Sequence, residues 1–238
     1  MHRQYECWYS PALDRDMEML VFGHGGTPLL VFPTSMGRFF DYENRNMIGA
    51  LRDKYAGGDL QAFCVDSVDA ESWYNKAAPP RSRIERHMAY ERYLLDEVLP
   101  FIRRHNDAAR IVVTGCSFGG YHSANFAFRH PELVEALVSF GGAFDIEQFL
   151  SGYYDEDCYY HCPPHFLANL DDAAILERIR RLRIILAAGE HDMCLGENLR
   201  LSRILDEKGI PHQLDVWGSG AGHDWPWWER MAVKFFGE

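Results

Sequence analysis

Continuously apolar segments alternate with segments of helical periodicity along this 238-residue chain, and that alternation restricts the folds open to it. Residues 109–117, ARIVVTGCS, form one apolar segment rich in β-branched side chains, and GGYHSANFAFRHPE at 119–132 has the spacing of a helix behind it. Strands that are apolar throughout are buried on both faces, which is typical of parallel sheets covered by helices. The alternation predicts an α/β fold with a mostly parallel, doubly wound sheet and helices on both faces.

The same pattern predicts the other elements. Strands are expected at 17–23, 28–33, 60–67, 133–145, 182–192 and 212–220, and helices at 46–58, 83–106, 197–211 and 227–238. The long helix contains Pro100, so we expect a kink near it. The first two of these strands are separated only by HGGT, which predicts a hairpin.

The length suits one large domain, although length alone would also permit two small ones. We expect a single domain over residues 1–238, interrupted by a loop-rich insertion at about 146–172. That segment is rich in Tyr, His and Asp and has no clean period. Loops of this kind often shape a binding site.

Charge and targeting signals narrow the function classes. The formal net charge of −11 argues against nucleic acid or an anionic membrane surface as a partner. The N-terminus has no apolar stretch behind a basic start, and no apolar run approaches the length of a transmembrane helix. The six cysteines are scattered, so we expect reduced thiols and a cytoplasmic protein.

The segment Gly115-Cys116-Ser117-Phe118-Gly119 matches the G-x-S-x-G pattern of a nucleophile elbow. A nucleophilic serine must stand at the end of a strand on a strained turn, and flanking glycines let neighbouring backbone approach without a Cβ clash. The helix that follows points its N-terminal amides at the place where negative charge develops. The position of the pattern between a strand and a helix makes Ser117 the expected nucleophile.

A serine hydroxyl is a weak nucleophile without a base, so the pattern predicts a carboxylate and then a histidine later in the chain. His223 lies in GSGAGHDWPWW, a loop after the last predicted strand, and is the expected base. His122 and His130 lie on the helix behind the serine, facing away from its hydroxyl. His212 begins a strand at the wrong edge of the sheet.

The acid should follow an earlier strand at the same edge as the base. Asp192 follows the strand at 182–192 and is the preferred candidate. Glu190 is a near rival and Asp145 a more distant one. A carboxylate there would fix the imidazole tautomer and stabilise the imidazolium formed during attack.

An oxyanion hole needs two backbone amides. The residue after the nucleophile, Phe118, is expected to supply one, and the loop after an early strand the other. The HGG at 24–26 is similar to a lipase motif, but its place between two adjacent strands favours a turn. The loop at 34–37, TSMG, leaves a strand toward a helix, so Ser35 is the expected second donor.

With these residues in place, the chain resembles the putative esterase family of α/β hydrolases. Relatives of that family include esterase D (S-formylglutathione hydrolase), feruloyl and acetyl-xylan esterases, and the mycolyltransferases. The segments LLVFPTSMG, GCSFGG, AAGEHD and GHDWPWW occur in the family's order over nearly the whole chain. The resemblance implies an α/β-hydrolase fold and a triad of Ser117, Asp192 and His223. In the family, the second oxyanion amide follows a His-Gly or Asp-Gly pair; here residues 33–34, Pro-Thr, replace that pair before Ser35.

Two other features carry weaker signals. The segment DCYYHCPPH contains Cys158, His161, Cys162 and His165, but its spacing is not that of a standard zinc site, so we expect no metal. Cys116 adjoins the nucleophile, and its side chain is expected to point into the packing beneath the elbow.

Aromatic residues crowd two of the predicted loops. Trp225, Trp227 and Trp228 follow the expected base, and large aromatics of this kind more often cover a core than bind a ligand. Trp225 is near enough to His223 to line the pocket in either case. Trp73 and Tyr74 follow a strand at the active edge, where they would form pocket walls or anchor the loop by burial.

Together these features predict a serine-dependent carboxylic ester hydrolase that works through an acyl-enzyme, with no cofactor. The expected substrate is a small-molecule or carbohydrate-linked ester, with no nucleic acid and no membrane as partner. An acyltransferase or a thioesterase would use the same acyl-enzyme. A non-catalytic binding module on a hydrolase fold is the alternative from another class, and the many aromatics leave a homodimer open.

Overall fold

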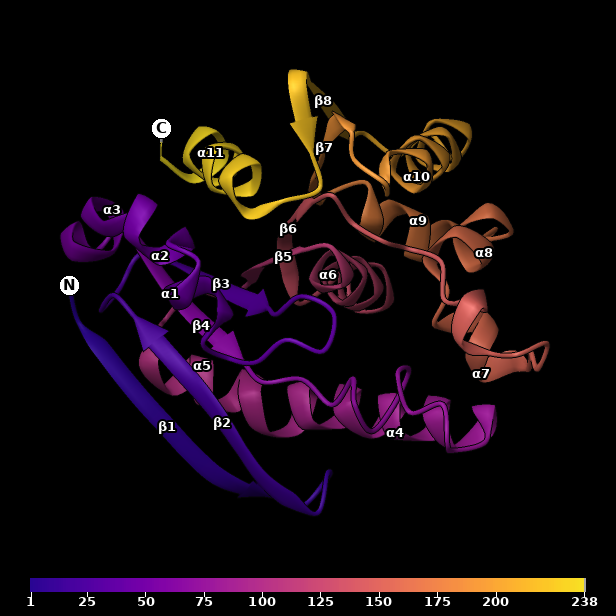
Figure 1. The fold of residues 1–238 in the computed structure, drawn as a ribbon, viewed down its shortest axis with the longest axis horizontal. Coiled ribbons are helices and arrows are strands. Elements are labelled where there is room, and N and C mark those ends of the chain that lie inside the picture. The colour runs from indigo at the N-terminus through magenta and orange to yellow at the C-terminus, as the bar shows by residue number, and fades with distance from the viewer. Residues whose placement is uncertain (238) are drawn as a thin grey trace.

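An eight-stranded sheet forms the centre of the computed structural model, which describes residues 1–237 (Figure 1). Its spatial order is β1-β2-β4-β3-β5-β6-β7-β8, and β2 runs antiparallel to both neighbours while β3 to β8 are parallel. The mostly parallel sheet predicted from the sequence is therefore confirmed. The strands are β1 (Arg3–Ser10), β2 (Arg15–Phe22), β3 (Thr27–Phe32), β4 (Leu60–Val65), β5 (Ile111–Cys116), β6 (Val134–Phe140), β7 (Arg183–His191) and β8 (Gln213–Gly222).

The predicted hairpin between the strands around HGGT is wrong. A turn does join β2 to β3, with Gly23 and Gly26 at φ of +85° and +81°, but β4 lies between these two strands in the sheet. The buried strand β4 pairs with both β2 and β3. The short connection from β2 to β3 therefore crosses the end of β4 and does not form a hairpin. The hairpin of this region is β1–β2, and β1 has no counterpart among the strands predicted from the sequence.

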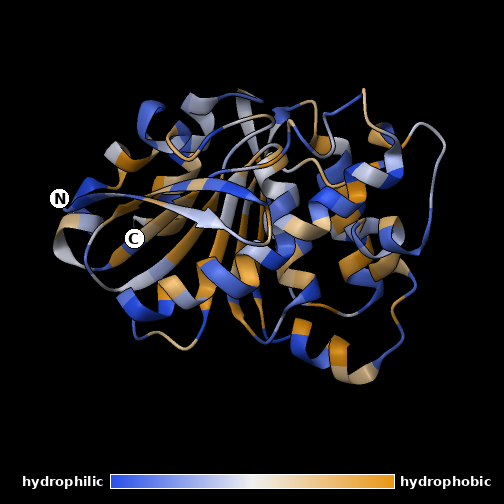
Figure 2. Cartoon of the chain, turned by 90° about the horizontal axis from the view of Figure 1, so that it is seen from below, coloured by the Kyte–Doolittle hydropathy of each residue, from blue (hydrophilic) through white to orange (hydrophobic). Residues whose placement is uncertain are grey.

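Helices cover both faces of the sheet, as predicted. One face carries α1 (Asp41–Asn44), α2 (Met47–Ala50), α3 (Arg52–Gly57) and α11 (Trp225–Phe236). The other carries α4 (Pro80–Tyr93), α5 (Leu99–His105), α6 (Phe118–Arg129), α9 (Ala173–Ile179) and α10 (Leu195–Glu207). Each face has its own apolar core, and Figure 2 shows the hydrophobic strands enclosed between these layers. Sheets buried on both faces need apolar residues in succession, which explains the sequence pattern.

Two predicted helices are interrupted. The segment 46–58 forms the two short helices α2 and α3, with Leu51 between them. The long segment 83–106 contains a π-helical turn, Leu94–Val98, which directly precedes α5. Pro100 is the second residue of α5. A proline removes one backbone donor and crowds the preceding turn, so an irregular turn at this point is the expected response.

The insertion at 146–172 contains short helices as well as loops. It contains a 3₁₀ turn (Glu147–Phe149) and the helices α7 (Glu156–Tyr160) and α8 (Pro163–Ala168). The Asp155 side chain caps α7 by accepting a hydrogen bond of 2.9 Å from the Cys158 amide. The helices are too short to give a readable period, and α8 packs against α6 and α10. Across residues 1–237, no helix combines the length and apolarity that crossing a membrane would require.

Candidate active site

Ser117 lies on a strained turn between β5 and α6, with φ 55° and ψ −121°. A non-glycine residue in this region costs on the order of 1–3 kcal/mol and persists only where neighbours hold it. Here the Ser117 amide donates to the Phe140 carbonyl at 2.9 Å, and the Ser117 carbonyl accepts from Gly120 and Ala143 at 2.9 and 3.1 Å. The turn is therefore fixed by backbone bonds from α6 and from β6 and the loop after it.

The two glycines of the motif are required by close packing. A Cβ on Gly115 would lie 2.4 Å from the Gly119 carbonyl group, and a Cβ on Gly119 would lie 2.6 Å from the carbonyl oxygens of Phe32 and Pro33. Both obstacles are backbone, which cannot move aside. The spacing G-x-S-x-G thus lets the start of α6 pack directly against the end of β3.

The structure brings Ser117, Asp192 and His223 together at the carboxyl edge of the sheet. His223 Nε2 lies 2.9 Å from Ser117 Oγ, and His223 Nδ1 lies 2.7 Å from Asp192 Oδ1. An ionised carboxylate only accepts, so Nδ1–H donates to Asp192 and Nε2 accepts from the serine hydroxyl. The Asp192 side chain is fully buried, whereas His223 is 17% exposed. This arrangement can move a proton from the serine to the imidazole.

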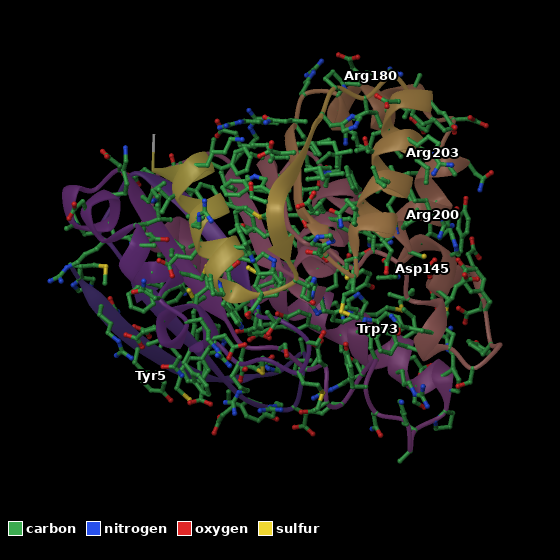
Figure 3. All side chains as sticks on the ribbon, turned by 45° about the horizontal axis from the view of Figure 1, so that its top comes forward. Tyr5, Trp73, Asp145, Arg180, Arg200 and Arg203 are labelled. Carbon is green, nitrogen blue, oxygen red and sulfur yellow. The ribbon has the colours of Figure 1, made fainter. Side chains whose placement is uncertain are left out.

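The two rival carboxylates lie elsewhere. Asp145 pairs with Arg200 of α10, with 2.7 Å between its Oδ2 and Nη1 of the arginine (Figure 3). Glu190 is exposed over less than half of its side chain and accepts a hydrogen bond of 2.7 Å from the Gly220 amide. Asp192 Oδ1 also accepts from the Cys194 amide at 2.7 Å, which orients the carboxylate toward His223.

Gly141 and Trp228 complete the surroundings of the Asp192–His223 pair. Gly141 has φ +56°, and a Cβ there would lie 2.4 Å from Asp192 Oδ2 and 3.2 Å from His223 Nδ1. The Trp228 ring meets the His223 ring edge-on, with 4.8 Å between centroids. Gly141 is not among the residues predicted from the sequence. The one local signal for it is the pair of consecutive glycines that directly follows β6. Trp228 is buried in the core, as the general tendency of large aromatics indicated.

The expected oxyanion donors lie on adjacent elements. Phe118 is the first residue of α6, and Ser35 follows β3, whose last residue, Phe32, pairs with Gly115. Within residues 1–237, neither amide donates a hydrogen bond to another protein group. The Ser35 hydroxyl accepts a hydrogen bond of 2.8 Å from Tyr74, whose ring packs edge-on against Phe118. Two free amides thus stand on neighbouring elements, one directly after Ser117 and the other in the turn after β3.

The structure also places the two aromatic residues after β4 and three other histidines that the sequence singled out. Trp73 is completely buried and anchors its loop, so it is not a pocket wall, whereas Tyr74 is partly exposed. His122 pairs with Asp69 and not with the serine. His130 binds Glu91 at 2.8 Å, and His212 binds Ser202 at 2.7 Å.

The buried cysteines and the Cys and His residues of the insertion are held within the protein. Cys116 is fully buried, and burial raises the pKa of its thiol well above the usual range. In the described part of the chain, Cys162 and His165 gather with Asp145 but not with Cys158 or His161. The Asp145 carboxylate is occupied by Arg200, a cation, and burial raises the pKa of Cys162 to about 12. These atoms are engaged within the protein and do not form a ready ligand set.

Known structures share this fold over nearly the whole chain. A ferulic acid esterase superimposes with a TM-score of 0.79 at 15% identity, covering 98% of this chain and 95% of that one. The S-formylglutathione hydrolase FrmB of Staphylococcus aureus gives 0.74 at 16% identity (98% and 97% covered). FphF, a fluorophosphonate-binding serine hydrolase of the same organism, gives 0.76 at 17% identity (98% and 96%). The expected α/β-hydrolase fold is thereby confirmed.

Two comparisons of the sequence with known proteins add to this structural similarity. A stretch of 60 residues is 38% identical to the Saccharomyces cerevisiae protein 1-acylglycerol-3-phosphate O-acyltransferase ICT1. That match covers 25% of this chain and only 15% of the length of the yeast protein. The family model described as Putative esterase matches residues 58–234, which is most of the chain and includes Ser117, Asp192 and His223. The chain belongs to the putative esterase family.

Proposed function

We propose that this chain is a serine-dependent carboxylic ester hydrolase acting through an acyl-enzyme. The observation that carries the proposal is the continuous series of contacts from Ser117 Oγ to His223 Nε2, at 2.9 Å, and from His223 Nδ1 to Asp192 Oδ1, at 2.7 Å. The strained elbow and membership of an esterase family support it. Similarity of fold alone would not support the proposal, because one fold serves many functions.

In the first half-reaction, Ser117 Oγ attacks the acyl carbon while His223 Nε2 takes its proton. The negative charge that develops on the former carbonyl oxygen is stabilised by the amides of Phe118 and Ser35, which have no competing acceptor among residues 1–237. Protonated His223 is stabilised by Asp192 and then gives its proton to the leaving alcohol. The product of this half-reaction is an ester between Ser117 and the acyl group.

In the second half-reaction, water attacks the acyl-enzyme while His223 accepts one of its protons. Collapse of the tetrahedral intermediate returns the proton to Ser117 and releases the carboxylic acid. Each step uses only side chains, backbone amides and the two reactants. The proposed substrates are esters of small alcohols or of carbohydrates, in keeping with the ferulic acid esterases among the structural neighbours. A thioester would react by the same steps.

The test is hydrolysis of a panel of esters and thioesters by the purified protein, with the Ser117→Ala variant as control. The panel should include p-nitrophenyl acetate and butyrate, methyl ferulate and an S-acyl glutathione. We expect turnover of at least one member, and its loss by a factor of about a thousand or more in the variant. Equal turnover by the two proteins would refute Ser117 as the nucleophile. No turnover of any member would favour the binding-module alternative.

The acyltransferase alternative is kept because of one observation, the 60-residue match to a yeast protein named as an acyltransferase. The same acyl-enzyme can be intercepted by an alcohol instead of water. Product analysis in the presence of glycerol, a sugar or 1-acylglycerol-3-phosphate distinguishes the two. Transfer that outruns hydrolysis at millimolar acceptor would assign the chain as a transferase, and exclusive release of acid would assign it as a hydrolase.

A further inference from the structure

Asp69 and His122 form a buried pair that the triad does not use. Asp69 Oδ1 lies 2.9 Å from His122 Nε2, and the two side chains are 0% and 3% exposed. The other carboxylate oxygen, Oδ2, accepts a hydrogen bond of 3.1 Å from the backbone amide of Met36. Burying a carboxylate is costly unless it is fully hydrogen-bonded, so this group is held in one orientation by two donors.

Met36 lies in a turn whose conformation needs support. The Gly37 amide donates to the Thr34 carbonyl at 2.8 Å, which closes a four-residue turn with Ser35 and Met36 at its centre. Met36 has φ +56°, a left-handed value at the turn position that normally favours glycine. The turn could relax by rotating the Ser35–Met36 peptide, which would return Met36 to negative φ.

The Asp69 carboxylate opposes that rotation. Rotation of the Ser35–Met36 peptide would point the Ser35 carbonyl, and not the Met36 amide, at Asp69 Oδ2. A carbonyl oxygen facing a buried carboxylate is repelled, whereas the amide is attracted. The buried charge thus selects the strained form of the turn. Ser35, whose amide is the proposed second oxyanion donor, belongs to the same turn.

His122 connects this support to the nucleophile. It lies on α6, four residues after Phe118 and therefore on the same face of the helix one turn along. Its ring is held between Phe32 of β3, with 5.7 Å between centroids, and Phe118, with 5.0 Å. A helix that carries the first oxyanion donor at its start thereby also holds, through Asp69, the turn that carries the second.

We propose that Asp69 and His122 are positioning residues that set the second oxyanion donor, the Ser35 amide, relative to the nucleophile helix. The inference rests on the proposed ester hydrolysis and extends it. Neither side chain is expected to touch substrate. Their effect should appear in kcat, because the oxyanion is fully formed only in the transition state, and KM should change little.

The matched variants are Asp69→Asn and Asp69→Leu, which are similar in shape. Asparagine keeps one acceptor for the Met36 amide, so we expect kcat within about fivefold of the wild type. Leucine leaves the Met36 amide without an acceptor and so releases the turn that carries the Ser35 amide. Loss of one oxyanion donor typically costs about 100-fold or more in kcat. We expect a loss of that size with KM within about threefold. Equal kcat values for the two variants would overturn the proposal.

A second substitution separates positioning from general damage to the fold. Met36→Gly makes the left-handed conformation nearly free of strain, so adding it to Asp69→Leu should restore kcat about five- to tenfold. No recovery in the double variant would contradict the role of the turn. As a matched control, His130→Phe breaks another histidine–carboxylate pair on the same helix, His130–Glu91, and should leave kcat unchanged.

Met36→Pro keeps the test decisive if Asp69→Leu does not fold. Met36 is 51% exposed, so the fold should tolerate the change, but proline has no amide hydrogen and requires negative φ. We expect a kcat loss of about 100-fold, and retained kcat would overturn the proposal. An inactive wild type would instead refute the proposed function. An active wild type with an inactive Ser117→Ala variant and unchanged Asp69 variants would refute only this inference.

Discussion

Substitution of Asp192 by asparagine removes one charge from the proposed triad while its shape is kept. Both hydrogen bonds that the Asp192 side chain accepts, from the Cys194 amide and from His223 Nδ1, go to the same oxygen, Oδ1. The other oxygen, Oδ2, has no hydrogen-bond partner in the part of the chain that the structure describes. Because the Cys194 amide requires an acceptor, the asparagine oxygen should occupy the Oδ1 position, and its NH₂ group the unpartnered side. His223 would then keep its hydrogen bond and its tautomer.

The expected loss therefore comes from electrostatics alone. With about 4 Å between the charge centres and an effective dielectric constant of about 20, the imidazolium–carboxylate attraction is about 4 kcal/mol. Loss of this stabilisation in the transition state corresponds to about a thousandfold decrease in kcat. A triad whose histidine switches tautomer on the same substitution loses about ten thousandfold. The geometry around Asp192 therefore predicts the smaller of the two effects.

The assay is steady-state hydrolysis of an activated ester by the wild type, Asp192→Asn and Glu190→Gln. Glu190 is the matched control, since it stands two residues earlier and contacts the Gly220 amide and not His223. We expect its variant to stay within about threefold of the wild type. A loss below tenfold in Asp192→Asn, or a larger loss in Glu190→Gln, would refute the assignment of the acid.

Three further predictions concern the surroundings of the site. Gly141→Ala should lower kcat at least tenfold and the free energy of unfolding by about 1–2 kcal/mol, because its Cβ would collide with Asp192 at positive φ. Ester assays measure kcat and urea denaturation measures the free energy of unfolding. A variant in which neither value changes would contradict the close packing at Gly141. Cys116, buried and with a raised thiol pKa, should resist iodoacetamide in the native protein at pH 8, and rapid alkylation seen by peptide mapping would argue against its burial. Burial, with His161 and His122 nearby, holds the pKa of His87 well below its usual value. The unfolded chain then binds a proton below about pH 6.5 that the folded chain does not, so this residue lowers stability by about 1.4 kcal/mol per pH unit as pH falls. Urea unfolding from pH 5 to 7.5 should show a shallower slope for His87→Phe, and identical slopes would count against a neutral buried His87.

The sequence carried the information for most of the sheet and for the positions of the site residues. Strands β3 to β8 are buried on both faces or preceded by clear helices, so their apolar runs and spacing are visible locally. Ser117, Asp192 and His223 each directly follow a parallel strand. Because carboxyl ends of parallel strands share one edge, chain order indicated the nucleophile and the base, but it left Glu190 and Asp145 as alternatives to Asp192.

Other features depend on tertiary structure. Strand β1, RQYECWYS, exposes Tyr5, Cys7 and Tyr9 and turns polar residues such as Gln4 and Glu6 to its half-buried side, so its alternation does not mark a buried apolar face. The turn after β2 leads to a strand two places away in the sheet, and only the presence of β4 between them explains why no hairpin forms. Asp69 and His122 are 53 residues apart, and nothing near either residue indicates that they meet.

The most direct test of the account is labelling of the intact protein with a fluorophosphonate, read by mass spectrometry beside a Ser117→Ala variant. We expect one adduct per wild-type chain, located on Ser117, and none on the variant. Circular dichroism of the two proteins should be the same, because Ser117 contributes little to the core. An unlabelled wild type, or an adduct that persists in Ser117→Ala, would contradict the claim that Ser117 is an activated nucleophile.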